Sequence, residues 1–129
     1  MREVIQTDKA PAPVGPYSQA IAASGKMVFA SGQIAIDPAS GEIIGDGDVA
    51  AQTEQVMKNL GEVLKAAGAD FSNVVKTGVF LADMNDFATM NGVYSKFFDE
   101  ATAPARELVE VANLPKFVNI EISVIVAVN

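Results

Sequence analysis

Two side chains in the last quarter of the sequence have the types and spacing needed to bind a small acid. Arg106, one of only two arginines, stands in the apolar setting Ala103-Pro104-Ala105-Arg106. Fifteen residues later, Glu121 interrupts a mostly apolar run that ends at Val128. A guanidinium offers two parallel donors to a carboxylate, and a partly buried glutamate can carry a proton. The two residues predict a site that grips a small anion.

Both residues also have purely structural interpretations. Arg106 can be a surface arginine on an edge strand, but its neighbours show no clean alternation between water and core, which favours a functional role by a small margin. Glu121 can be an exposed strand residue, or a buried partner of Arg106 or of a lysine. For Glu121 the pattern leaves the structural and the functional interpretation equally open.

Four further residues are candidates for lining such a site. Tyr17 lies in a rigid proline- and glycine-rich loop, where it either packs in the core or covers a ligand. Ser31 and Gly32 end a predicted strand, and a glycine there allows a ligand to approach the backbone. Asn91 falls on the apolar face of a predicted helix, although such amides more often satisfy local backbone groups.

The composition excludes several kinds of chemistry. The chain has no His and no Cys, which removes an imidazole base, a thiolate nucleophile and a Cys/His zinc site. We expect no metal and no cofactor. Nine Lys plus Arg against sixteen Asp plus Glu give a net charge of −7, and the lysines are scattered singly. A nucleic acid is therefore a poor partner.

Length and hydropathy predict a single oligomeric domain. The 129 residues suit one domain over 1–129, and half of them are hydrophobic, with a mean hydropathy of +0.25. A domain of this size leaves about a third of its unfolded surface in water, so we expect subunit contacts to hide part of it. No signal peptide and no membrane-length apolar run is visible, which predicts a soluble, cytoplasmic protein without membrane partners.

The apolar periodicity predicts an α+β fold with a mixed β-sheet and two helices packed on one of its faces. A hairpin signal at Ser24-Gly25-Lys26 predicts that the first strands form a meander. Asp48 is positioned to cap the first helix and Gly68 to end it. The predicted elements are strands over 20–23, 27–36 and 42–44, a helix over 48–68, a strand over 74–81, a helix from Asp83 or Asn85, and strands over 105–112 and 119–128.

Several segments together are similar to one known family. The likeness runs in order, nearly without gaps, from about residue 3 to the C-terminus. The segments are Gly15-Pro16-Tyr17-Ser18-Gln19-Ala20, Ala30-Ser31-Gly32-Gln33-Ile34, Phe80-Leu81-Ala82-Asp83-Met84-Asn85-Asp86-Phe87, Asn91-Gly92-Val93-Tyr94, Pro104-Ala105-Arg106, Val109-Glu110-Val111, Leu114-Pro115-Lys116 and Ile120-Glu121-Ile122. They resemble the RidA/YjgF family of enamine/imine deaminases.

The resemblance implies a chorismate-mutase-like fold assembled as a homotrimer with three clefts between subunits. It implies that Arg106 holds the substrate carboxylate and that Glu121 positions or activates water. Residues matching Tyr17, Ser31, Gly32 and Asn91 would line the cleft, with Tyr17 coming from the neighbouring subunit. The implied activity is that of a 2-iminobutanoate/2-iminopropanoate deaminase, a hydrolase of C–N bonds that converts 2-aminoacrylate or 2-iminobutyrate to ammonia and a 2-oxo acid.

The chain departs from the family pattern at Leu108. Many members have cysteine at that position, in Pro-Ala-Arg-Ser-Cys-Val-Glu-Val. A backbone N–H at Leu108 can still contact a ligand, but no thiol can act there. We also expect Leu108 to fill more of the cleft and Glu107 to add negative charge beside Arg106.

Three hypotheses about function follow. The leading one is hydrolytic deamination of reactive enamines and imines, which requires only carboxylate binding, one oriented water and one proton carrier. A non-catalytic, regulatory binder of small 2-oxo acids would use the same Arg106 anchor. An endoribonuclease, an activity also attached to the family, is disfavoured by the negative charge.

Overall fold

The computed structural model describes residues 1–129 as six strands, two α-helices and five single-turn 3₁₀ segments. The strands are β1 (Arg2–Ile5), β2 (Ala20–Ala23), β3 (Lys26–Gln33), β4 (Val74–Leu81), β5 (Ala105–Glu110) and β6 (Ile120–Val128). The helices are α1 (Val49–Ala66) and α2 (Phe87–Tyr94). The 3₁₀ segments are Phe71–Asn73, Met84–Asp86, Ser95–Phe97, Glu100–Thr102 and Pro115–Phe117.

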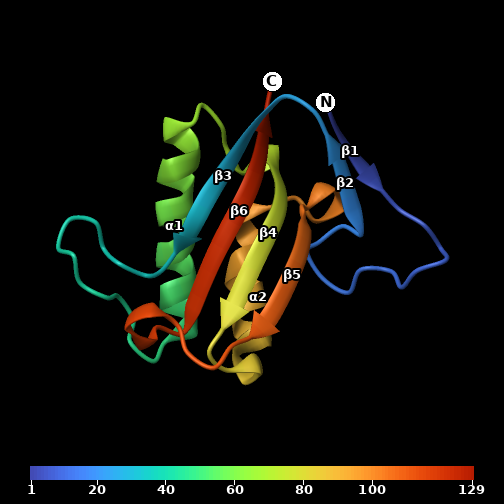
Figure 1. Cartoon of the computed structure of the whole chain (residues 1–129). Coiled ribbons are helices and arrows are strands. Elements are labelled where there is room, and N and C mark those ends of the chain that lie inside the picture. Colours follow the sequence, from blue (N-terminus) through green and yellow to red (C-terminus); the bar gives the residue numbers. More distant parts are fainter.

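The main sheet has four strands in the order β3-β6-β4-β5, and both α-helices lie on the same side of it (Figure 1). The β3–β6 and β6–β4 pairs are antiparallel, whereas β4 and β5 are parallel, joined by a crossover that contains α2. Strands β1 and β2 form a separate two-stranded sheet. The prediction of an α+β fold with a mixed sheet and two helices on one face is confirmed.

Helix α1 begins and ends where its sequence signals lie. The Asp48 carboxylate accepts a hydrogen bond from the Ala51 amide at 3.1 Å, which satisfies one of the free N–H groups of the first turn. Gly68, just past the end, has a φ of +74°, a conformation that favours glycine. The side chains that α1 buries against the sheet recur at helical spacing: Val49, Gln52, Thr53, Val56, Met57, Leu60 and Leu64.

The predicted N-terminal meander is wrong. Strand β2 pairs with β1 and not with β3, so Ser24-Gly25-Lys26 carries the chain across to another sheet instead of closing a hairpin. Strand β3 ends at Gln33, before the predicted end at residue 36. The predicted strand over 42–44 is reduced to a single bridge between Ile36 and Ile43.

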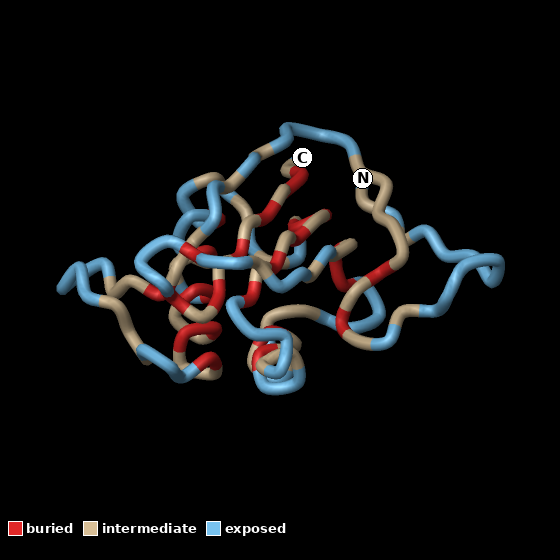
Figure 2. Tube along the Cα trace, turned by 60° about the horizontal axis from the view of Figure 1, so that its bottom comes forward, coloured by how far each residue is buried: buried red, intermediate tan, exposed pale blue.

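The hydrophobic core lies between the main sheet and the helices. Fifteen buried residues form one cluster there, and they come from α1, α2, β4 and alternate positions of β6, together with Ala35 just after β3. Figure 2 shows buried positions gathered in the middle of the molecule, with exposed loops projecting at both ends. The helices therefore cover one face of the sheet and leave the other face open.

The open face of the sheet carries apolar side chains that no other part of the chain covers. Strand pairing aligns Phe29 with Ile125 and Val109 with Phe80, which places all four on this face. Phe29 is 72% exposed and Val109 is 43% exposed. Exposed apolar sheet faces of this kind are typical of surfaces that bind another protein molecule.

Candidate active site

Strand register places Arg106 on the helix-covered face of the sheet, and a loop contact brings Tyr17 to it. It pairs with Thr77 of β4, whose side chain is fully buried beneath α2. The loop that carries Tyr17 is tied to the start of β5, because the Ser18 hydroxyl donates to the Ala103 carbonyl at 2.6 Å and the Ser18 amide to the Pro104 carbonyl at 3.2 Å. This attachment places Tyr17 beside Arg106.

The Arg106 guanidinium is held by one amide and three aromatic rings. Its Nη1 donates to the Asn91 Oδ1 at 2.7 Å. The guanidinium carbon lies 5.0 Å from the ring centre of Tyr94, 5.4 Å from that of Tyr17 and 5.9 Å from that of Phe87, all within cation–π range. Arg106 is thus oriented by neutral groups.

No carboxylate neutralises this arginine. The single ion pair of the chain joins Lys76 to Glu107 at 3.4 Å, and no carboxylate oxygen lies within 4.0 Å of Arg106. Burial lowers the pKa of Arg106, partly opposed by the nearby Tyr94 and Tyr17. A half-buried cation that keeps free N–H groups and lacks a counter-ion is suited to binding an anion.

Arg106 opens into a cavity of about 320 Å³ with an otherwise apolar or aromatic lining. The lining residues are Val14, Tyr17, Met84, Phe87, Arg106 and Leu108. The volume lies at the lower end of the range of about 300–1,000 Å³ that small-molecule sites occupy. One charged donor in an apolar wall suits a ligand with a carboxylate and a small apolar body.

Glu121 lies on the open face of the sheet, together with Ser31 and Gly32. Between Ala30 and Gln33 the pairing of β3 with β6 shifts register, so Ser31 and Gly32 form a bulge next to Glu121. A Cβ at Gly32 would collide with the Glu121 carboxylate, so a larger residue there would displace that side chain from its present position. These three residues form a second, separate group.

Arg106 and Glu121 of one chain lie on opposite faces of the sheet, so one chain alone does not bring them into a single site. Arg106 pairs with Thr77 and Glu121 with Phe80 on the same strand, β4. Because Thr77 and Phe80 are three positions apart, their side chains point to opposite faces of the sheet, and so do those of their partners.

Tyr17 of the same chain approaches Arg106, whereas the family resemblance implies a Tyr17 from the neighbouring subunit. Glu107 adds no charge beside Arg106, because it points to the open face and pairs with Lys76. Asn91, Tyr17 and Leu108 do lie around Arg106, whereas Ser31 and Gly32 lie with Glu121.

Sequence reasoning assigned Phe87 and Tyr94 only to the core, and it did not consider Val14 or Met84 as cavity residues. The signal for two of them was present: Phe87, Asn91 and Tyr94 are spaced i, i+4, i+7 and therefore share one face of α2. That spacing places two rings and an amide in one row, which is the row that contacts Arg106.

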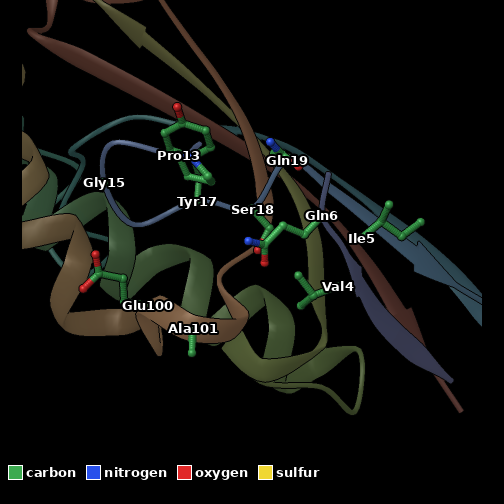
Figure 3. A pocket seen from close by; sticks show the side chains of 10 residues that line it. All are labelled: Val4, Ile5, Gln6, Pro13, Gly15, Tyr17, Ser18, Gln19, Glu100 and Ala101. Atoms are coloured by element: carbon green, nitrogen blue, oxygen red, sulfur yellow. The ribbon is translucent and has the colours of Figure 1, made fainter. Parts of the chain in front are cut away.

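A second cavity, of about 240 Å³, lies on another side of Tyr17. Figure 3 shows Glu100 and Ala101 of the 3₁₀ segment on one side of it and the loop residues Pro13 and Tyr17 on the other. Its lining contains Glu100 as the only charged side chain and no cation. It is therefore unsuited to a carboxylate ligand, and the Arg106 cavity is the candidate site.

The fold contains no cluster of three or more Asp, Glu, His or Cys side chains arranged to hold a metal ion. None of its helices combines the length and apolar character needed to cross a membrane.

Comparison with known proteins defines the class to which this fold and site belong. Residues 7–128 match the family described as Endoribonuclease L-PSP. A RutC family protein of Synechocystis is 61% identical over 120 residues, which cover 93% of this chain and 92% of the relative. The mouse protein named 2-iminobutanoate/2-iminopropanoate deaminase is 50% identical over 97% of this chain and 90% of its own.

A solved structure with a bound small molecule has the same fold. The crystal structure of Escherichia coli TdcF with bound serine matches this chain with a TM-score of 0.74 and 43% sequence identity. The match covers 98% of this chain and 99% of the TdcF chain. The chain belongs to the Endoribonuclease L-PSP family, which is the YjgF/RidA family.

Proposed function

We propose that this protein hydrolyses 2-aminoacrylate and 2-iminobutyrate to ammonia and the 2-oxo acids pyruvate and 2-oxobutyrate. The observation that carries the proposal is the half-buried Arg106, which lacks a counter-ion and faces an apolar cavity. A four-carbon imino acid has one carboxylate for the guanidinium and a short apolar chain for the cavity wall. Relatives at about 50% identity carry the deaminase name.

The reaction makes few demands on the protein. The imine tautomer is electrophilic at C2, so water adds there to give a carbinolamine, whose C–N bond then breaks to release ammonia and leave the ketone. Arg106 holds the carboxylate, and Asn91 holds Arg106. Glu121 takes a proton from the water as it adds and gives it to the nitrogen, and then moves the second proton from the carbinolamine hydroxyl to the departing amine. No metal or cofactor enters these steps.

The placement of Arg106 and Glu121 on opposite faces supports a site built by two copies, if both residues act on one substrate molecule. We infer a homotrimer in which the Arg106 cavity of one copy meets the Glu121, Ser31 and Gly32 group of the next. The exposed apolar side chains of the open face, Phe29 and Val109 among them, support an assembly that covers this face. Three chains of 13.5 kDa would give a particle of about 40 kDa, which light scattering on a size-exclusion peak measures.

A second candidate is binding of 2-oxo acids without turnover. A specific observation favours it: one chain alone completes the Arg106 anchor, without any residue of the Glu121 group. An endoribonuclease function, which the family description carries, gains no support from the net charge of −7 or from a site with a single cation.

A trapping assay separates these candidates. A serine dehydratase generates 2-aminoacrylate in the presence of semicarbazide, and the trapped imine is measured with and without this protein. We expect the protein to lower the amount of trapped imine and to speed the appearance of pyruvate. Calorimetric binding of 2-oxobutyrate with no effect on trapping would establish the binder instead.

A further inference from the structure

Beneath Arg106, on the side away from the cavity, lies a buried pair of hydroxyl groups. The Thr77 Oγ1 and the Tyr94 Oη are 2.9 Å apart, and both side chains have no exposed surface. The core cluster around them is otherwise composed of apolar side chains and contains Tyr94 itself. A buried polar pair stabilises a fold no better than a well-packed apolar pair, so its presence at this point calls for an explanation.

Strand register and helix packing place both members of the pair next to Arg106. Thr77 is the β4 residue that register pairs with Arg106, and the Tyr94 ring lies 5.0 Å from the guanidinium carbon, nearer than any other ring. Tyr94 also follows Asn91 by three residues, so one face of α2 presents an amide oxygen and a phenol to the same guanidinium.

The Tyr94 hydroxyl is protonated and can both donate and accept a hydrogen bond. Burial raises the pKa of Tyr94, an effect that the Thr77 hydrogen bond and the charge of Arg106 oppose, so the hydroxyl remains protonated near neutral pH. A phenol has one proton to donate and an oxygen that accepts. If that proton goes to Thr77, the lone pairs of the Tyr94 oxygen are left for the cation.

We propose that Tyr94 and Thr77 are positioning residues that hold the Arg106 guanidinium in one orientation from below, while Asn91 holds it from the side. The proposal rests on the proposed function, in which Arg106 binds the substrate carboxylate. An arginine fork binds a carboxylate bidentately only when its plane is fixed, and a carboxylate that swings carries C2 away from the attacking water. Neither Thr77 nor Tyr94 lines the Arg106 cavity.

The test removes each hydroxyl and keeps the shape of the side chain. Tyr94→Phe retains the ring over Arg106, and Thr77→Val retains the branched side chain. Thr53→Val is the matched control, because Thr53 is equally buried but donates within α1 to the Val49 carbonyl at 2.7 Å. Circular dichroism and thermal melting report the folding of each variant.

Two readouts separate positioning from general stability. Calorimetric titration with 2-oxobutyrate is expected to show about tenfold weaker binding in Tyr94→Phe and Thr77→Val than in the wild type and in Thr53→Val. Side-chain ¹⁵N relaxation is expected to show a more mobile Arg106 Nε in the same two variants. The chain has only two arginines, so Arg2, which donates to the Val74 carbonyl, is an internal control whose signal should not change.

The outcomes distinguish this inference from the function on which it rests. Wild-type protein that binds no 2-oxobutyrate would remove the carboxylate site and the positioning role together. Wild-type binding that both hydroxyl variants retain in full, with unchanged Arg106 relaxation, would overturn only the positioning role. Equal weakening in Thr53→Val would also overturn it, because the loss would then follow stability and not the contact with Arg106.

Discussion

The two faces of the main sheet differ in how much of their surface the single chain covers. On the helix-covered face, α2 and the Tyr17 loop enclose Arg106 with an amide and three rings. On the open face, Glu121 lies beside a glycine bulge on a surface whose apolar side chains face outward. One half of the candidate site is finished by its own chain, and the other half lacks a covering partner.

This difference ties the proposed site to the proposed assembly. If Arg106 anchors the substrate and Glu121 carries the proton, the two residues of one chain cannot act on the same substrate molecule, because they lie on opposite faces of the sheet. In the proposed trimer, oligomerisation would bring the Arg106 of one copy to the Glu121 of the next. A substitution on one face therefore tests whether the other face keeps its share of the function.

The largest effect is expected from a charge on the open face. Phe29→Glu places a carboxylate where Phe29 is 72% exposed, and burying it in an interface without a partner is costly. We expect the trimer to dissociate to the 13.5 kDa chain and imine hydrolysis to fall below detection, while the Arg106 cavity still binds 2-oxobutyrate. Light scattering and calorimetry measure the two properties.

Val63→Glu is the matched control for this substitution, because Val63 is also an exposed apolar residue but lies on α1. It should leave mass and activity unchanged. A fully active monomer of Phe29→Glu would contradict the two-copy site.

The next effect is expected at Glu121. Glu121→Gln keeps the size and hydrogen-bonding capacity of the side chain but removes its ability to accept a proton. General acid–base groups contribute about 10²–10⁴ in rate, so kcat should fall by that order while 2-oxobutyrate binding persists. Imine hydrolysis and calorimetry on the same preparation check this. Turnover within a few-fold of wild type would show that Glu121 is not the proton carrier.

Much of the helical and central-strand structure could be predicted because its signals are local. Strand β4 has the predicted bounds, 74–81, since a short β-branched run between turn residues fits few alternatives. The predicted cap of α1 at Asp48 is confirmed for the same reason. Strand β1 was missed because its four residues include two charges and are ordered only by pairing with β2, which is distant in sequence.

The division of the site could not be read from the sequence. Alternation within β5 or β6 tells which residues share a face with Arg106 or with Glu121. It does not tell which face of the sheet each set occupies, because that depends on the register of both strands against β4. The sequence therefore supplied candidate residues but not their placement on opposite faces of the sheet.

A somewhat smaller effect is expected for Arg106→Lys. Lysine keeps the charge on the helix-covered face but loses the planar fork, so the carboxylate can swing and C2 can drift from the water. A misplacement of about 1 Å can cost about 100-fold in rate, and we expect Arg106→Lys to be nearly as damaging as Arg106→Ala. Imine hydrolysis at matched concentrations, with circular dichroism for folding, measures both. Near-wild-type imine hydrolysis by Arg106→Lys would show that Arg106 contributes only its positive charge and not the geometry of its guanidinium.

The smallest effect is expected for Leu108→Ala. This substitution tests whether the cavity lining contributes to function or whether Arg106 alone is sufficient. Leu108 lines the Arg106 cavity and packs against the core, so its loss should lower stability by roughly 2–3 kcal/mol, at the lower end for such truncations. The guanidinium contacts to Asn91 and Tyr94 do not involve Leu108 and should survive. We therefore expect kcat/KM within a few-fold of wild type below the melting transition, measured beside a thermal melt of the same sample. If the folded variant instead lost as much kcat/KM as Arg106→Ala, the Leu108 side chain would be needed to position the substrate against Arg106.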